Sequence, residues 1–153
     1  MGSTIGRLRF AVLWLVAGSA LAGTMAVFFY EPGVLEEGVA GVMEGDPVTM
    51  GMAQLMAAMV AVPLVMAVVA LFVPARASAI SSLVVGVPLG AFGLYAAASE
   101  LAGGALHAHL TLTALAVASV WLIVGLSVAV LLRLARGNAA SASVSGRAGG
   151  SGA

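Results

Sequence analysis

Residues 30–49 read YEPGVLEEGVAGVMEGDPVT, and this stretch decides how the rest of the chain must be arranged. It holds five of the six acidic residues and no basic residue. Long apolar segments precede and follow it, and the arginines lie at the far ends of those segments. We therefore interpret residues 31–47 as the acidic extracytoplasmic loop of a membrane protein.

The composition excludes an ordinary soluble domain. Of the 153 residues, 62% are hydrophobic and 8% are charged, whereas soluble domains average about 45–50% apolar and about 25% charged residues. A short soluble chain buries only about two-thirds of the surface that it exposes when unfolded. The chain has no cysteine, which excludes disulfides, thiolate metal sites and a cysteine nucleophile.

Four apolar segments are long enough to cross a bilayer as helices, since about 20 helical residues span a hydrocarbon core of ~30 Å. They cover residues 10–30, 48–73, 79–99 and 106–134. The sequence thus predicts an all-α fold, an antiparallel four-helix transmembrane bundle. Because the turns near residues 74–78 and 100–106 are short, we expect the second, third and fourth helices to pack as sequential neighbours. The first helix, on its longer loop, is freer in placement.

The ends of these helices carry capping signals. Asp46 before Pro47 predicts the start of the second helix, and Ser78 predicts the start of the third. Within the acidic loop, Leu35 and Val39 have helical spacing, which fits a short amphipathic helix. An irregular solvated loop fits equally well. A cleaved signal peptide is a rival interpretation of the first segment, but signal sequences have shorter apolar regions.

The charges predict an orientation. If both termini are cytoplasmic, all six arginines lie inside and all six acidic residues lie outside, as the positive-inside rule requires. Residues 1–9 are then a cytoplasmic N-terminus. Residues 137–153 consist mainly of Gly, Ala and Ser, and we expect them to form a disordered cytoplasmic tail.

Two sets of residues predict how the helices pack. A small-residue face in the third segment lets another helix approach closely; its glycines are Gly86, Gly90 and Gly93. Prolines remove a backbone donor and are expected to kink their helices; these are Pro63 and Pro88.

The second segment carries side chains that could face a ligand. Three methionines with helical spacing share one face, near a glutamine; the set is Met52, Gln54, Met56 and Met59. Methionine sulfurs are ligands for Cu(I), and they also fill gaps in apolar cores. The spacing fits both interpretations, and core packing is the commoner one.

No ionisable residue lies deep within a predicted span, which argues against a proton-coupled exporter or a membrane cytochrome. The candidate chemistry lies at the outer face, where Glu100, His107 and His109 occur together. They are weak candidates for a metal site or for acid–base catalysis, and solvated interfacial side chains are the plainer interpretation. If His107 lies near Glu100, the carboxylate should raise the pKa of the imidazole.

Residues 8–135 resemble a family of small bacterial four-helix membrane proteins of unknown function. The similarity rests on Tyr30-Glu31 at the end of the first span, the Pro/Gly/acidic loop, and the second-span sequence Val62-Pro63-Leu64-Val65-Met66. Members often have an acidic residue shortly before that proline, where this chain has Val60 and Ala61. The resemblance implies four helices in a bacterial inner membrane and no particular activity.

These observations favour a non-enzymatic protein that packs with other helices or binds a hydrophobic ligand or lipid. A small transporter or channel subunit is the alternative, and a membrane enzyme or a metal-binding protein acting at the outer face is less favoured. We expect the lipid bilayer as the main partner, and a homo-oligomer or another membrane protein as the protein partner. We expect no cofactor, no catalytic residue and no nucleic acid.

Overall fold

The computed structural model describes residues 2–43, 46–102 and 109–148, and these are almost entirely helical. The elements are α1 (Gly2–Phe28), α2 (Val34–Ala40), β1 (Val42–Met43), β2 (Asp46–Pro47), α3 (Met50–Phe72), α4 (Ala75–Ala102) and α5 (Leu110–Ala148). Four of the helices are long and apolar enough to cross a membrane. The predicted all-α fold with four long apolar helices is therefore confirmed.

The two strands form a small antiparallel pair beside α2. Val42 pairs with Pro47, and Met43 pairs with Asp46. The described part of the acidic loop thus contains a short helix and a pair of strands, so the short helix predicted there is present. Leu35 and Val39 on that helix are nevertheless exposed, so they pack little against the rest of the chain.

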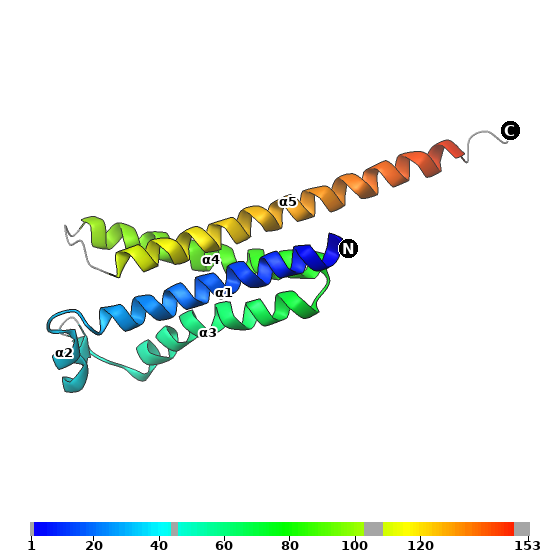
Figure 1. Ribbon diagram of the computed structural model, residues 1–153. Coiled ribbons are helices and arrows are strands. Elements are labelled where there is room, and N and C mark those ends of the chain that lie inside the picture. Colours follow the sequence, from blue (N-terminus) through cyan, green and yellow to red (C-terminus); the bar gives the residue numbers. More distant parts are fainter. Residues whose placement is uncertain (1, 44–45, 103–108, 149–153) are drawn as a thin grey trace.

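The long helices do not pack in the predicted order. Helix α1 lies against both α3 and α5, and α4 packs mainly against α5 (Figure 1). Helices α3 and α4 touch little, although only two residues separate them. The prediction of sequential neighbours is wrong for this pair because side-chain shape, and not the length of the connection, selects the packed faces.

The centre of the bundle is built on α1. Phe10, Trp14 and Ala17 on this helix are almost completely buried. The indole nitrogen of Trp14 donates a hydrogen bond of 3.0 Å to the hydroxyl of Ser82 on α4. With no water in the core of a bilayer, a buried polar group needs such a partner, so the bond fixes how α1 lies relative to α4.

Glycines of α4 leave room for large side chains of α5. A methyl group built on Gly93 would lie 2.7 Å from a methyl of Val117, and one on Gly90 would lie 3.1 Å from the indole of Trp121. One on Gly86 would lie 3.1 Å from Val124. All three glycines of the predicted small-residue face therefore lie against α5.

The outer surface of the bundle is apolar on every long helix. Large side chains such as Leu15, Val65, Val84 and Leu122 are more than half exposed to the surroundings. Apolar patches of this extent are rare on soluble proteins. Lipid chains are the environment that would cover them.

Several predicted boundaries are wrong. Helix α3 is capped by Thr49, whose hydroxyl accepts a hydrogen bond of 3.2 Å from the backbone N–H of Met52. Asp46 lies in β2 instead, because pairing with Met43 holds its backbone extended. Ser78 does not cap α4 but lies buried inside its first turns, since α4 begins directly after Pro74. Pro63 and Pro88 lie inside α3 and α4, and the kinks expected at these two residues stay predictions.

The tail is also different from the prediction. Residues 137–148 continue α5 as helix, where the sequence predicts a disordered tail, and residues 149–153 lie outside the described part of the chain. The segment is rich in alanine, the best helix former, and lacks proline. Extending an existing helix adds one hydrogen bond per residue without a new nucleation step, so this composition is sufficient.

Candidate functional site

One end of the bundle gathers the acidic side chains, and we call it the acidic end. There α1 ends, α3 begins, α4 ends and α5 begins, and α2 lies across it (Figure 1). Glu31, Glu37 and Glu100 lie at this end by their places in those elements. The arginines whose side chains are described lie toward the opposite end, at the start of α1, the start of α4 and the distal part of α5.

A tight turn places Glu31. After α1 ends, the backbone N–H of Glu31 donates to the carbonyl of Phe28 at 3.1 Å, and its own carbonyl accepts from Val34 at 3.2 Å. Gly33 has φ of 88°, a left-handed conformation that side chains other than glycine rarely adopt. The chain therefore reverses within a few residues, and Glu31 stays near the axis of the bundle.

His109 lies immediately before α5. Its carbonyl accepts a backbone hydrogen bond of 3.0 Å from Thr113, and the hydroxyl of Thr113 donates to the same oxygen at 3.1 Å. These bonds anchor His109 to the first turn of the helix. Phe28 packs against its ring edge-on, with centroids 5.6 Å apart.

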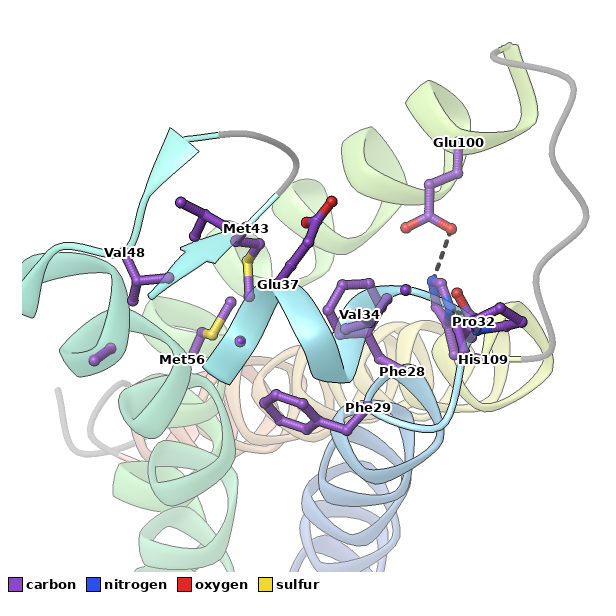
Figure 2. A pocket seen from close by; sticks show the side chains of 15 residues that line it. Phe28, Phe29, Pro32, Val34, Glu37, Met43, Val48, Met56, Glu100 and His109 are labelled. Atoms are coloured by element: carbon purple, nitrogen blue, oxygen red, sulfur yellow. Dashed lines mark hydrogen bonds and ion pairs between the residues drawn. The ribbon is translucent and has the colours of Figure 1, made fainter. Parts of the chain in front are cut away.

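Two carboxylates flank the His109 ring, one on each nitrogen. Nδ1 lies 2.7 Å from Oε1 of Glu31, and Nε2 lies 3.0 Å from Oε2 of Glu100. Figure 2 shows the contact with Glu100, whose side chain reaches from α4 to the ring. The three side chains, here called the His109 cluster, join the end of α1, the end of α4 and the start of α5.

This geometry favours the charged form of His109. A neutral imidazole has one N–H and can donate to one carboxylate only, whereas the imidazolium donates to both. Burial lowers the pKa of His109, but the hydrogen bonds that its ring donates to Glu31 and Glu100, together with their negative charge, raise the pKa by more. The net result is a pKa above the ordinary value of 6.5.

A pocket of about 720 Å³ opens beside the His109 cluster. Such volumes are typical of sites for small organic ligands. Most of the described residues in its wall are apolar, and the titratable ones are Glu31, Glu37, Glu100 and His109. Figure 2 labels the last three of these. The apolar wall consists of Phe28, Phe29, Pro32, Val34, Val42, Met43, Val48, Ala53 and Met56.

No known family model, curated protein or solved structure matches this chain. The pocket and the His109 cluster are therefore the observations on which a function can be argued.

The outer-face candidates come together only in part. Glu100 and His109 are in contact, whereas His107 lies outside the described residues. Within residues 2–43, 46–102 and 109–148, no group of three His, Cys, Asp or Glu side chains could hold a metal ion. The reason is visible in the His109 cluster, where the two carboxylates contact opposite nitrogens of one ring.

The candidate ligand-facing residues of α3 separate into two groups. Met56 lines the pocket, and Met59 lines a second, smaller one of about 80 Å³ between the helices. Met52 is half-buried. Gln54 is exposed and lines neither of these two pockets, so its assignment as a ligand-facing residue stays a prediction. Its place on the helix, two residues from both Met52 and Met56, turns it to another face.

Three hydroxyl groups of α5 are hydrogen-bonded within the helix itself. Thr113, Ser119 and Ser127 each donate to a backbone carbonyl four residues earlier in the same chain, at 2.8 to 3.1 Å. Such back-bonding satisfies a hydroxyl in an apolar environment. These side chains therefore give little support to a polar path along the bundle.

Sequence reasoning missed the role of Glu31. It grouped Glu31 with the solvated loop acids, although this residue directly follows the aromatic end of the first span. A carboxylate at that position sits at the bundle end, whereas Glu36, five residues later, is exposed on α2. Position relative to the span was the available signal.

Proposed function

We propose that this chain is a non-enzymatic, multi-pass membrane protein that binds a hydrophobic ligand in the pocket at its acidic end. The observation that carries the proposal is the pocket itself, about 720 Å³ in volume and walled mainly by aromatic and aliphatic side chains. Its place at the end of the bundle would let an amphiphilic molecule enter from the membrane surface.

The chemistry of the wall supports binding over catalysis. No described residue lining the pocket carries a hydroxyl or thiol that could act as a nucleophile. Both nitrogens of His109 already contact carboxylates, so neither is free to accept a proton from a substrate. Catalytic bases need such a free position within reach of the reacting group.

The arrangement of charge supports the orientation that we propose for the chain. Acidic side chains at one end and arginines toward the other fit a bacterial inner membrane with both termini in the cytoplasm. The pocket then faces the extracytoplasmic side, and the bilayer is the principal partner of the bundle.

The test uses the absence of cysteine from the natural chain. A single cysteine replaces Met56, which lines the pocket, and a matched variant replaces Met50, which lies on the same helix, is 75% exposed and does not line it. Both are reconstituted in lipid nanodiscs and treated with N-ethylmaleimide, with and without decanol as an uncharged hydrophobic probe.

Decanol should slow the labelling of Met56→Cys and leave the labelling of Met50→Cys unchanged, because only the first thiol would be covered. Equal effects on both variants, or none on either, would contradict a hydrophobic ligand site at this end.

A further inference from the structure

Among the described residues that line the pocket, the charges are of one sign, apart from one histidine. Glu31, Glu37 and Glu100 contribute carboxylates to its wall, and His109 contributes one imidazole. Even when His109 is protonated, the carboxylates outnumber the positive charge. No arginine is among the described residues that line the pocket.

The arginines whose side chains are described cannot compensate this charge from nearby. Arg7 lies in the first turns of α1 and Arg76 in the first turn of α4, both at the end of the bundle away from the pocket (Figure 1). Arg133 and Arg136 lie more than 20 residues into α5, or more than about 30 Å along a helix. That separation exceeds the Debye length of about 8 Å at physiological salt.

The aromatic side chains in the wall favour a positively charged ligand, as the carboxylates do. Phe28 and Phe29 both line the pocket, with ring centroids 6.1 Å apart. The face of an aromatic ring attracts cations, most strongly where water is excluded. Aliphatic side chains from α2, β1 and α3, namely Val34, Met43 and Met56, complete an apolar surface beside these rings (Figure 2).

From this combination we infer that the ligand is a lipophilic cation, an apolar body carrying a quaternary or protonated amine or another onium centre. The inference rests on the proposed function, because it names the class of molecule that the same pocket accepts. The apolar body lies against the aromatic and aliphatic wall, and the positive charge lies toward Glu37 and Glu100.

The opposite class is disfavoured on the same grounds. A fatty acid or an anionic lipid would bring its negative group among three carboxylates, at a cost that increases where solvent is partly excluded. A neutral hydrophobic molecule would fill the apolar wall but gain nothing from the carboxylates. The pocket therefore selects ligands by the sign of their charge and not by their shape alone.

The experiment uses two probes of matched shape and opposite charge, tetraphenylphosphonium and tetraphenylborate. Each is titrated against the Met56→Cys variant in nanodiscs of neutral lipid, and the protection from N-ethylmaleimide is measured. The reagent is uncharged, so its own approach does not depend on the carboxylates. Met50→Cys reports any effect of the probes on the bilayer alone.

The charge is then changed by one unit at two neighbouring positions. Glu37→Gln removes a carboxylate from the pocket wall, whereas Glu36→Gln removes one from the same short helix at an exposed position that does not line the pocket. We expect Glu37→Gln to weaken tetraphenylphosphonium protection by about fivefold, the upper range for one partly exposed charge pair. Glu36→Gln should leave it unchanged. Thermal unfolding of both variants checks that each remains folded.

The outcomes separate this inference from the proposed function. Selective protection by the cation, weakened only by Glu37→Gln, supports it. Equal protection by both ions, or equal loss in both glutamine variants, overturns the cationic class, while protection by decanol still supports a hydrophobic ligand. Failure of all three probes to protect Met56→Cys overturns both.

Discussion

One imidazole ring at the acidic end has a carboxylate on each of its nitrogens, at 2.7 and 3.0 Å. At the scale of single residues, this is the arrangement with the clearest energetic consequence. His109 is buried, and an imidazolium in such a place is stable only with its charge compensated. Glu31 supplies that compensation from the turn after α1, and Glu100 supplies it from the end of α4.

The stability of the bundle should therefore depend on pH. Because the pKa of His109 in the folded chain lies above 6.5, its contribution is fully present below pH 6.5 and is lost as the pH rises through the folded-state pKa. Thermal unfolding in detergent, followed from about pH 6 to about pH 9, should show a falling midpoint across this range.

The control for this prediction is His109→Gln, which has no titrating ring. Its unfolding midpoint should change much less over the same interval. If the wild-type chain and the variant lose stability in parallel as the pH rises, the His109 cluster is not the group responsible.

At the scale of the elements, the contact between α4 and α5 depends on glycines, because a residue without a side chain lets the two helices approach closely. Val117 occupies the space that a side chain at Gly93 would need, and Trp121 and Val120 do the same at Gly90. Membrane helices gain stability mainly from such close packing, since lipid is as apolar as the helices themselves.

Replacing Gly93 with alanine should destabilise the bundle by about 1–3 kcal/mol, the usual cost of overpacking. The added methyl would lie 2.7 Å from Cγ2 of Val117, a β-branched side chain with few alternative rotamers in a helix. Unfolding in a mild detergent titrated with dodecyl sulfate measures the change.

Gly125→Ala is the matched control, since no side chain or neighbouring helix comes within 4 Å of the position that its new methyl group would occupy. It should be neutral or stabilising by up to about 1 kcal/mol, because alanine favours helix over glycine. Equal destabilisation by both substitutions would show that close packing at Gly93 is not the cause.

The sequence was sufficient for the existence of these helices and for part of their packing. Uninterrupted apolar length predicted the four long helices, and the 4-3 spacing of Gly86, Gly90 and Gly93 predicted a packed face. It did not predict that α1 would lie between α3 and α5. Part of the helix arrangement depends on how Trp14 of α1 fits beside Ser82 and Gly86 of α4, a three-dimensional complementarity without a periodic signature.

The site was less predictable than the helices. Glu100 and His109 were recognisable because polar residues between two apolar spans must meet at one bundle end. Glu31 belongs to the cluster because a left-handed turn at Gly33 keeps it near the axis. The pocket depends on α2 and the β1–β2 pair folding across that end. Such a loop arrangement is set by tertiary contacts and leaves no pattern along the chain.

At the scale of the whole molecule, the charges are sorted between the two ends of the bundle. Acidic side chains lie just after α1, on α2 and near the end of α4, whereas arginines lie near the starts of α1 and α4. Translocation keeps arginine-rich segments in the cytoplasm. The proposed orientation is thus a property of all the segments together and not of any single loop.

Two single-cysteine variants test this orientation without altering any charge. Val39→Cys lies on exposed α2, and Ala77→Cys lies exposed in the first turns of α4. A membrane-impermeant maleimide added to intact cells should label the first, and should label the second only after permeabilisation. The reverse pattern would place the pocket on the cytoplasmic side.

The unequal length of the helices has a mechanical consequence. Helix α5 starts at the His109 cluster, has 39 residues, and extends beyond the other helices at the far end of the bundle (Figure 1). If α5 moves as a rigid rod about 58 Å long, a tilt of about 5° at its His109 end displaces its tip near Ala148 by about 5 Å. A change of tilt that began at the pocket would therefore be largest at the tip of α5, at the opposite end of the bundle.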